Sequence, residues 1–507
     1  MILTVVAEDR KSYSVEASSN LLSVLRRYGY LPDAVCGGNG ICGKCLVEIE
    51  GKGKRLACKT IINEDMTVIL KKQTDNISAL GLTDKYGSNM TDEKDTLLAE
   101  ENIEDKNYAI AIDIGTTTLA FALLNISSER VLDTYTSRNH QYTYGLDVIS
   151  RIKASNDGEK ASLKKCIQED LYRGIAILLE KNDIQPEALK NVILSGNTTM
   201  GHLLFGYNCQ SLGVYPFTPV TIDRIEEDAD KVFENADLAH AKVVFLPGIS
   251  TFVGADIVSG LYQCEFLQKD KPCLLIDLGT NGEMAIGMKD KILVASTAAG
   301  PAFEGGNITY GVASVKGAIC SIEIDDVKHC KCQTIADGMP IGICGTGVIE
   351  AIAELRKAGL VDETGLLTEE YFENGFPLAL AQDGTEIVIT QKDIREIQLA
   401  KAAIRVGLET LIHRYGTSYK EIECVYIAGG FGYFMDIQKA TLIGMLPNEL
   451  REKTIAAGNT SLNGAIKYIL QENAKEKCHE IVNISEEISL ATDKEFQEFY
   501  MEYMLFE

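Results

Sequence analysis

The 507-residue sequence predicts an α/β protein whose first domain is a small α+β unit. Three observations indicate this fold class. Residues 1–74 combine short apolar strands, one helical stretch and four cysteines; residues 75–107 are polar and acidic; and from residue 108 onward one strand–turn–strand pattern occurs twice. A chain of this length has room for two or three domains with sizeable cores. We therefore expect an N-terminal domain, a linker, and a duplicated pair of α/β lobes over residues 108–507.

The stretch CGGNGICGKC, residues 36–45, matches three different motifs. Its glycines fit the dinucleotide fingerprint G-x-G-x-x-G, and with Lys44 they nearly fit the phosphate loop G-x-x-x-x-G-K-[ST]. Both nucleotide motifs need a strand before the glycines and a helix after them, whereas here a helical stretch precedes them and the strand-like LVEIEG follows. Cys45 also stands where a phosphate loop needs a hydroxyl, and a thiol is a poor ligand for Mg²⁺. The surroundings therefore argue against both nucleotide motifs.

The same stretch supplies three of four cysteines that have the spacing of a metal site. Cys36, Cys42, Cys45 and Cys58 form C-x5-C-x2-C-x12-C, close to the C-x4-C-x2-C…C spacing of plant-type [2Fe–2S] proteins. Structural zinc and four inert cysteines are the alternatives, although zinc sites favour paired short spacings. The glycines would let the backbone wrap tightly around a cluster. With short strands flanking one helix, this region resembles a ferredoxin-like β-grasp domain.

Composition narrows the classes of partner. The formal net charge is −24, and no run of eighteen apolar residues occurs. An acidic surface disfavours nucleic acid and anionic membranes, and neither a membrane span nor a signal peptide is predicted. Fourteen cysteines in such a chain indicate reduced thiols and metal rather than disulfides. We expect a cytoplasmic protein that acts on small molecules or a protein partner, with no nucleic acid and no membrane.

Two further segments carry weaker predictions. Residues 75–107 read as an acidic linker with at most one short helix, and a flexible chain of this length spans ~30 Å on average. The quartet His329-Cys330-Lys331-Cys332 could form a second metal site with Cys320 or Cys344. Because no spacing motif supports that site, we expect a surface turn there.

The repeated pattern predicts a phosphate site. YAIAIDIGTTTLAFALLN and PCLLIDLGTNGEMAIGM each read as a strand, a tight turn and a returning strand, with Asp113 and Asp277 at corresponding places. Such a turn offers N–H groups and threonine hydroxyls to phosphate, and its aspartate can hold Mg²⁺ through water. One Asp-x-Gly-Thr turn is weak evidence, because buried strands often end in this way. Two turns, together with the Gly-rich AGGFG after a strand and CGTG before a helix, favour a nucleotide site between two lobes.

This order of motifs resembles the actin-like ATPase superfamily, which includes acetate and sugar kinases, Hsp70 and hexokinase. The resemblance implies two duplicated lobes of the ribonuclease H-like fold, with the second phosphate hairpin at about residues 273–287. It also implies three sets of residues around ATP and Mg²⁺. These are a first hairpin with Asp113, Gly115, Thr116, Thr117 and Thr118; a second with Asp277, Gly279, Thr280, Asn281 and Gly282; and an adenosine site with Gly429 and Gly430 near Gly345, Thr346 and Gly347.

Two other residue groups receive roles from the same resemblance. Asp256, where the Gly-rich turn of PGISTFVGADIVSGL enters a helix, is the candidate for the acidic residue near the attacking water. The alternative is a carboxylate that only complements the helix dipole. In STAAGPAFEGG we expect Gly300, Glu304 and Gly305 to line the nucleotide cleft, and Ser296 to contact a partner.

The combination of both parts is similar to one particular family, the reductive activators of corrinoid proteins. Besides the cysteine motif, three segments are typical of that family: LSGNTTMGHLLFG, LIDLGTNGE and STAAGPAFEGG. The resemblance implies ATP-dependent transfer of one electron from an external protein donor, through a [2Fe–2S] cluster, to Co(II) of a corrinoid protein. It implies a homodimer too. Some members carry a further small domain between the two parts, for which residues 75–107 leave no room.

Two other functions stay open at this point, because a fold does not fix a function. The first is a small-molecule kinase of the acetate or sugar kinase type with an appended redox domain. The second is an electron-transfer or scaffold protein that binds ATP only for structure. The combination of motifs, rather than the fold, favours the reductive activator.

Overall fold

The structure is a computed structural model that describes residues 1–7, 10–28, 30, 45–70, 107–326, 328–429 and 435–506. The predicted linker, residues 75–107, lies outside the described residues except for Asn107. No helix of the described residues is long and apolar enough to cross a membrane.

The N-terminal residues form a five-stranded mixed sheet with the order β2-β1-β7-β4-β5. Its strands are β1 (Ile2–Val6), β2 (Arg10–Ser14), β4 (Leu46–Ile49), β5 (Gly53–Leu56) and β7 (Met66–Ile69), and β3 (Ser19–Asn20) pairs with β6 (Ile61–Ile62). Helix α1 (Leu21–Arg27) begins at Asn20, whose side chain accepts a hydrogen bond from the Ser23 amide, and it buries four apolar side chains. The short strands and the single helix were predicted from the sequence.

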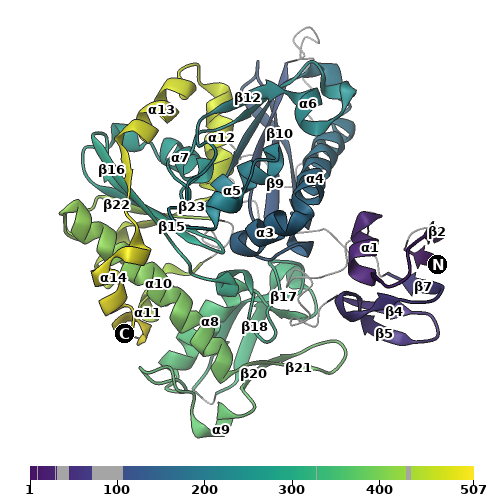
Figure 1. The fold of residues 1–507 in the computed structure, drawn as a ribbon. Coiled ribbons are helices and arrows are strands. Elements are labelled where there is room, and N and C mark those ends of the chain that lie inside the picture. Colours follow the sequence, from purple (N-terminus) through teal and green to yellow (C-terminus); the bar gives the residue numbers. More distant parts are fainter. Residues whose placement is uncertain are drawn as a thin grey trace, which may run out of the picture.

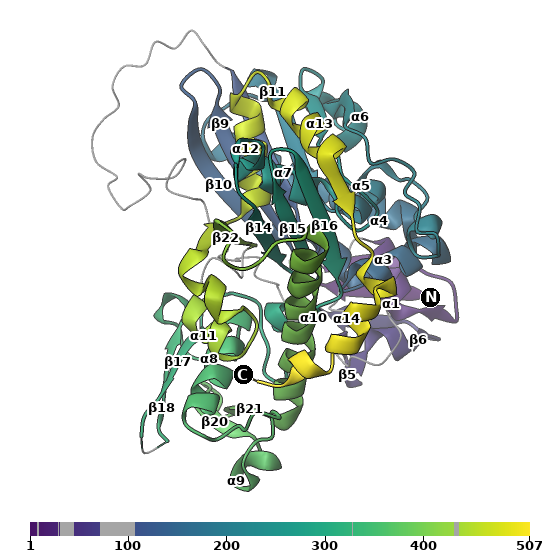
Figure 2. The same ribbon diagram turned by 90° about the vertical axis from the view of Figure 1, so that its left-hand side faces the viewer.

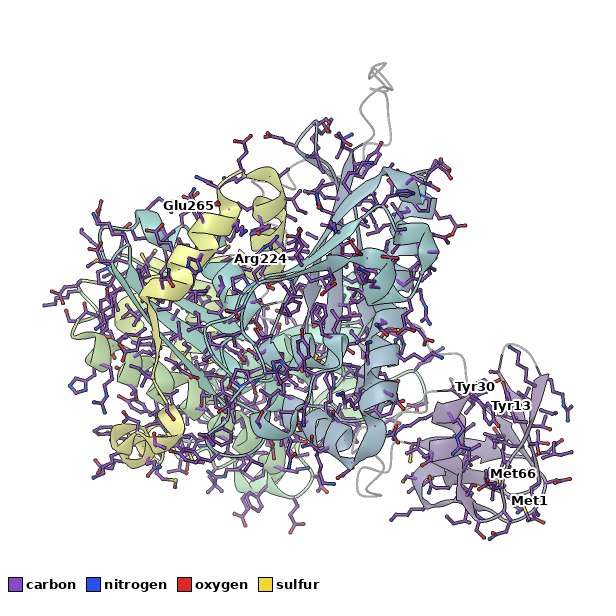
Figure 3. The ribbon with its side chains drawn as sticks, turned by 45° about the horizontal axis from the view of Figure 1, so that its top comes forward. Met1, Tyr13, Tyr30, Met66, Arg224 and Glu265 are labelled. Carbon is purple, nitrogen blue, oxygen red and sulfur yellow. The ribbon has the colours of Figure 1, made fainter. Side chains whose placement is uncertain are left out.

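This unit stands beside the larger part of the molecule (Figures 1 and 3), next to α3 (Val148–Ala154) in Figure 1. Its own aromatic residues pack together, and the hydroxyls of Tyr13 and Tyr30, both labelled in Figure 3, lie 2.9 Å apart. The guanidinium of Arg26 on α1 lies 4.6 Å from the ring centre of Tyr144 in the first lobe. The N-terminal unit thus has a core of its own and touches the lobes through α1.

The two lobes contain sheets that share a five-stranded topology and differ in the position of the sixth strand. The first sheet has the order β10-β9-β8-β11-β13-β12 and the second β23-β22-β14-β15-β16-β24. In each sheet three consecutive strands form an antiparallel meander, a later strand pairs in parallel with the first strand of the meander, and the next one pairs in parallel with that later strand. The duplication predicted from the two Asp-x-Gly-Thr turns is therefore confirmed.

The bounds of the strands agree closely with the predicted hairpins. The first sheet contains β8 (Tyr108–Ile114), β9 (Thr118–Asn125), β10 (Arg130–Arg138), β11 (Leu189–Gly196), β12 (Ile225–Asp228) and β13 (Lys242–Phe245). The second contains β14 (Cys273–Leu278), β15 (Gly282–Met288), β16 (Lys291–Thr297), β22 (Cys424–Ala428), β23 (Thr454–Gly458) and β24 (Ser485–Glu487). Both turns of interest lie between the first two strands of a meander.

Helices cover both sheets. The first lobe carries α3 (Val148–Ala154), α4 (Lys160–Lys181), α5 (Thr198–Phe205), α6 (Ala229–Phe233) and α7 (Ala255–Gln263). The second carries α8 (Gly345–Lys357), α9 (Glu369–Phe372), α10 (Gln391–Tyr415), α11 (Ile437–Leu442), α12 (Thr460–Leu470), α13 (Ala474–Ile484) and α14 (Lys494–Phe499). Helix α10 begins with a Thr390–Asp393 capping box, ends at Gly416 with φ 79°, and lies against β15 and β16 (Figure 2).

Helices α7 and α12 hold the two lobes together. They follow equivalent strands, β13 and β23, and pack against each other between the two sheets (Figure 1). Glycines permit the close crossing, since a Cβ on Gly464 of α12 would lie only 2.1 Å from the carbonyl oxygen of Ser259 on α7. The N-terminal ends of α7 and α12 consequently lie close together between the two lobes.

The segment between β16 and β22 adds two small sheets to the second lobe. These consist of β17 (Ala318–Ile324), β18 (Cys330–Thr334) and β19 (Gly342–Ile343), and of the hairpin β20 (Phe376–Leu380) and β21 (Glu386–Ile389). The predicted surface turn at the His329 quartet is wrong from Cys330 onward, because Cys330 begins strand β18. Cys330 and Cys332 alternate with two polar residues along this strand, so their sulfur atoms share one face, 3.4 Å apart. Among the described residues no group of three or more His, Cys, Asp or Glu is arranged to hold a metal ion, so the second metal site gains no support.

Candidate nucleotide site

A cavity of about 180 Å³ lies between the two lobes, where the two predicted turns face each other. The turns contribute Gly115–Thr118 from the first lobe and Gly279–Asn281 from the second, together with the aspartates that precede them. The complete lining is Asp113, Gly115, Thr116, Thr117, Thr118, Ala120, Asn197, Asp256, Asp277, Leu278, Gly279, Thr280, Asn281, Glu283, Phe303, Glu304, Ala313, Ser314, Gly429, Asn459 and Ser461. Residues from eight separate parts of the sequence therefore meet in one cavity.

The first turn is fixed by the chain around it. The Gly115 amide donates to the Thr118 carbonyl at 3.0 Å, and a Cβ on Gly115 would lie 2.5 Å from that oxygen. The fully buried Arg151 lies behind the turn and donates to the carbonyl oxygens of Thr116, at 2.6 Å, and Gly145, at 2.9 Å. Asn139 donates to the carbonyl oxygen of Gly115 at 2.9 Å. These contacts hold the turn so that Thr117 and Thr118 face the cavity.

Asp113, at the end of β8, is held by the start of α12. Its carboxylate accepts one hydrogen bond from Asn459 at 2.9 Å and one from the Ser461 hydroxyl at 2.7 Å. The Ser461 hydroxyl also lies 2.9 Å from that of Ser195, on the neighbouring strand β11. The second half of the chain thus orients the aspartate of the first half.

The second turn has an equivalent framework. The Gly279 amide donates to the Asn281 carbonyl at 3.0 Å, and Asp277 lies opposite Glu283 in the β14–β15 register. Gly429, with φ 90°, closes one side: a Cβ there would lie 2.6 Å from the Leu278 carbonyl oxygen and 2.8 Å from the Asp277 carboxylate. Only glycine permits this approach, which agrees with the close backbone contact predicted for an adenosine at this point.

Five carboxyl groups line the cavity, those of Asp113, Asp256, Asp277, Glu283 and Glu304, and burial raises the pKa of each. Burial and then the charge of Asp113 raise the pKa of Asp256 to about 7. Burial and then the charges of Asp256 and Asp113 raise that of Asp277 to about 8. Burial, followed by Asp256 and Asp277, raises the pKa of Glu283 well above its usual range, and burial raises that of Asp113 despite its hydrogen bonds to Ser461 and Asn459. The side chains repel one another, so the cavity attracts a cation.

This donor set fits Mg²⁺ held partly through water. Carboxylate oxygens are the ligands that Mg²⁺ prefers, and the ion usually keeps several water molecules and binds to one or two carboxylates and to substrate phosphates. Among the described residues no three such side chains are close enough to form a complete cage. The Asp113, Asp256 and Asp277 carboxylates line the same cavity as the two turns, which suits a hydrated ion that arrives with phosphate.

Glu304 lies between the two turns. One of its carboxylate oxygens accepts the Thr117 hydroxyl of the first turn at 2.8 Å and the Thr280 hydroxyl of the second at 2.9 Å. Burial raises the pKa of Glu304, and the two threonine hydrogen bonds oppose that rise. This is the direct side-chain link between the two phosphate turns that the described residues show.

Six predicted cleft residues do not line the cavity. Gly282 is buried where α10 packs on β15, since a Cβ there would lie 2.1 Å from Ile404. Gly345 and Gly347 are packed against the carbonyl oxygens of Phe303 and Ile319. The full set is Gly282, Gly300, Gly305, Gly345, Thr346 and Gly347. Gly430 lies outside the described residues, and Ser296 lies opposite Glu283 in the β15–β16 register.

Several residues that shape the cavity were not predicted from the sequence. Asn459 and Ser461 lie far from both hairpin motifs in the chain, and Arg151 resembles an ordinary charged residue of an amphipathic helix. Glu283 ends the LIDLGTNGE motif and could have been found from it. A cavity-facing Asn197 caps α5 and donates to the Thr116 hydroxyl at 3.2 Å.

The predicted cysteine site is described only in part. No disulfide joins Cys45 and Cys58, and their sulfur atoms lie 3.2 Å apart at the edge of the N-terminal core. Two thiolates on one tetrahedral metal, each bonded at about 2.3 Å, lie about 3.8 Å apart. A small displacement would therefore let both thiols bind one metal atom, so this half of the site fits an iron–sulfur cluster. Cys36 and Cys42 lie outside the described residues.

Comparison with known proteins adds independent findings. Residues 271–507 match the family model described as the C-terminal domain of RACo, the ASKHA domain, and residues 108–269 match the RACo middle region. The chain is 31% identical to the corrinoid activation enzyme RamQ of Eubacterium limosum, over 97% of each chain. It is 29% identical to the [Co(II) methylated amine-specific corrinoid protein] reductase of Methanosarcina barkeri, over 78% of this chain and 76% of that protein.

A solved structure resembles nearly the whole chain. It is described as a reductive activator for corrinoid, iron-sulfur protein, and it superposes with a TM-score of 0.74 at 26% identity. The match covers 99% of this chain and 98% of that one. The similarity therefore includes the N-terminal unit as well as the two lobes.

Proposed function

We propose that this chain, which belongs to the family of corrinoid activation enzymes, couples ATP hydrolysis to the reduction of Co(II) to Co(I) in a corrinoid protein. The observation that carries this proposal is the cavity in which two duplicated phosphate turns meet five carboxyl groups, in a chain similar over its whole length to a reductive activator. Co(I) would then be available for methyl transfer.

The lobes would bind ATP and Mg²⁺. The phosphates would bind to the two turns, Gly115–Thr118 and Gly279–Asn281. The adenosine would lie close to Gly429 and to Gly430, the next residue in the sequence. Asp113 and Asp277 would hold the hydrated Mg²⁺, while Asp256 would orient the attacking water. Asp256 suits that task because its carboxyl group, at the first turn of α7, lines the cavity opposite both turns.

We propose three parts of the chain: an N-terminal domain over residues 1–74, a linker over residues 75–107, and ATPase lobes over residues 108–507. The redox centre would lie in the N-terminal domain. Cys36, Cys42, Cys45 and Cys58 would hold a [2Fe–2S] cluster, which supplies a one-electron centre with a potential typically near −400 mV. An external protein would donate the electron. We further propose a cytoplasmic homodimer.

ATP is needed because Co(I) forms at a more negative potential than such a centre provides. Each 100 mV of the difference costs about 2.3 kcal/mol for one electron. A nucleotide can shift an equilibrium only through its different affinity for two conformations. Two lobes that meet at one cavity and share the α7–α12 contact have the geometry for such a pair of conformations. We propose that ATP favours the conformation that binds the corrinoid partner and alters the ligation of its cobalt.

The kinase alternative is weaker. Full-length similarity includes the N-terminal unit, which a small-molecule kinase would not need. A kinase would release a phosphorylated metabolite, whereas the proposed enzyme releases ADP and phosphate.

The test is an anaerobic reduction assay with the full chain. Chemically reduced protein is mixed with a Co(II) corrinoid protein, with and without MgATP, and the visible spectrum of cobalt is followed. We expect Co(I) only when MgATP is present, and no Co(I) with the Asp277→Ala variant. The exposed Asp290→Asn variant is the matched control. Co(I) formation that does not depend on ATP would contradict the proposal.

A further inference from the structure

The hydrogen bonds of Glu304 cross the cleft between the lobes. Thr117 belongs to the first lobe, while Thr280 and Glu304 belong to the second. Both threonines give their hydroxyl proton to the same carboxylate oxygen of Glu304. A threonine hydroxyl has one proton to donate. A phosphate group that accepts hydrogen bonds from these two hydroxyls must therefore displace Glu304.

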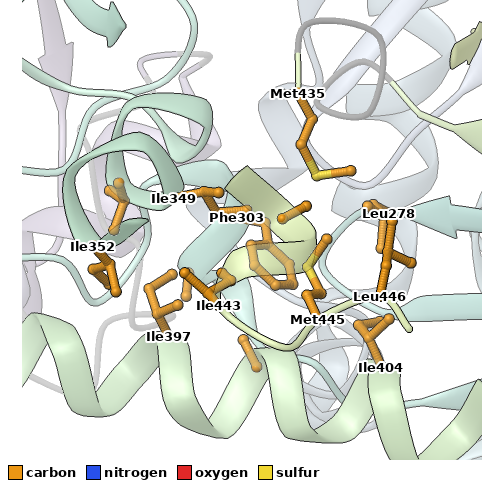
Figure 4. Close-up of a cluster of buried hydrophobic side chains, with 14 of the residues drawn as sticks. Leu278, Phe303, Ile349, Ile352, Ile397, Ile404, Met435, Ile443, Met445 and Leu446 are labelled. Carbon is orange, nitrogen blue, oxygen red and sulfur yellow. The ribbon is translucent and has the colours of Figure 1, made fainter. Parts of the chain in front are cut away.

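The position of Glu304 is fixed by the second lobe. It ends the short 3-10 helix η8 (Pro301–Glu304), and the preceding Phe303 is buried in the core beside Leu278 and Met445 (Figure 4). Gly305, with φ 77°, follows directly, and a Cβ on it would lie 2.5 Å from the Val312 carbonyl oxygen. The backbone that carries Glu304 is thus closely packed, so that the carboxylate itself, rather than the helix, would move aside.

The negative charge of Glu304 also opposes the binding of a nucleotide. Its carboxylate shares the cavity with Asp113, Asp256, Asp277 and Glu283. The nearest buried cation, Arg151, directs its N–H groups to backbone carbonyl oxygens behind the first turn. Phosphate groups would add further negative charge beside Glu304, and like charges in a buried site repel each other more strongly than in water. Glu304 and the phosphates therefore compete for the same two donors.

We propose that Glu304 is a positioning residue that links the two phosphate turns across the cleft and that nucleotide phosphate releases this link. It would thus act as a competitor of the nucleotide rather than as a ligand of it. The inference deepens the proposed function, on which it rests, because it specifies how phosphate binding changes the connection between the lobes. Without nucleotide, Glu304 keeps the turns at a set separation; with nucleotide, the phosphates take over both hydroxyls.

The test measures nucleotide affinity by calorimetry, with MgADP as the ligand and without any corrinoid protein. Glu304→Gln removes the charge but keeps the size of the side chain, and we expect it to lower the Kd for MgADP about tenfold. Glu304→Ala removes the link altogether, and we expect a decrease of similar size. Glu386→Gln, an exposed change on β21, should leave the Kd unchanged. We also expect the KM for ATP to fall in Glu304→Gln while kcat does not rise.

A second measurement separates this role from simple packing. Amide hydrogen exchange of the first turn should be faster in nucleotide-free Glu304→Ala than in the wild type, and saturating MgADP should abolish the difference. A higher Kd in Glu304→Gln would overturn the proposal and make Glu304 a ligand of the metal or phosphate. An unchanged Kd with unchanged exchange would reduce Glu304 to a packing residue. A wild-type chain that binds no MgADP would instead contradict the proposed function itself.

Discussion

Replacing Asp277 with asparagine should make the nucleotide-free protein more stable although it removes activity. The wild-type carboxyl group has its pKa raised to about 8, first by burial and then by Asp256 and Asp113. The folded state therefore keeps a proton that the unfolded chain would release above pH 3.8. At pH 7 this difference amounts to about 1.36 kcal/mol for each pH unit above 3.8, or at most about 4 kcal/mol. Water in the cavity and the burial of the new amide reduce the expected gain to about 2 kcal/mol.

The sign of the pH dependence follows from the raised pKa. The unfavourable contribution of Asp277 is absent below pH 3.8, grows as the pH rises, and is complete above pH 8. The stability difference between Asp277→Asn and the wild type should consequently be small at pH 4.5 and several times larger at pH 8. Asp290→Asn, at an exposed position, should show no such trend.

The assay is urea unfolding in the presence of EDTA over a series of pH values. The chain contains no tryptophan, so circular dichroism is the suitable signal. Adding Mg²⁺ at pH 8 should raise the midpoint of the wild type more than that of the variant, because the ion compensates the carboxylate charge. A variant that is no more stable at pH 8, or a difference that does not change between pH 4.5 and pH 8, would refute the reasoning.

Three other predictions follow from contacts at the site and in the fold. Ser461→Ala removes a hydrogen bond to the Asp113 carboxylate, and because a hydrogen bond to a charged group contributes about 1.5–3 kcal/mol, ATP turnover should fall about tenfold or more. Ser461→Thr keeps the hydroxyl and should lose less of the ATP turnover. Gly464→Ala places a Cβ 2.1 Å from the Ser259 carbonyl oxygen, and the resulting overpacking of α7 against α12 should lower the free energy of unfolding by about 1–3 kcal/mol. An unchanged midpoint of urea unfolding would contradict this close packing of the two helices. Cys58→Ser should abolish bound iron and labile sulfide, whereas the MgADP affinity measured by calorimetry should stay the same, because Cys58 lies in the N-terminal unit. A full iron content in this variant would show that Cys58 is not a ligand of the cluster.

The parts of the site that the sequence predicted are those carried by local patterns. An aspartate, a glycine and a threonine between two apolar strands specify a hairpin turn wherever they occur. Two copies of this pattern therefore predicted both the duplication and the meeting of Asp113 with Asp277 at one cavity. Gly429 was predicted in the same way, because a strand that ends in several glycines lets another group approach closely.

The parts that could not be predicted depend on contacts between distant residues. Asn459 and Ser461 reach Asp113 because α12 crosses α7 between the lobes, and no local pattern encodes that crossing. Gly345 and Gly347 read as an anion site at a helix start but serve close packing against Phe303 and Ile319. Their role as nucleotide contacts stays a prediction, like the cluster ligands Cys36 and Cys42, which lie outside the described residues.

The distance along the chain between Asp113 and its two partners affects the newly synthesised protein. Asn459 follows Asp113 by 346 residues and Ser461 by 348. At about 5–20 residues per second, the ribosome needs about 17–70 s to add them. During that time the first lobe can fold around its sheet, but its aspartate lacks the hydrogen bonds that orient it. Unfinished chains therefore contain the first phosphate turn without a complete site, and ATP hydrolysis begins only when α12 has packed between the lobes.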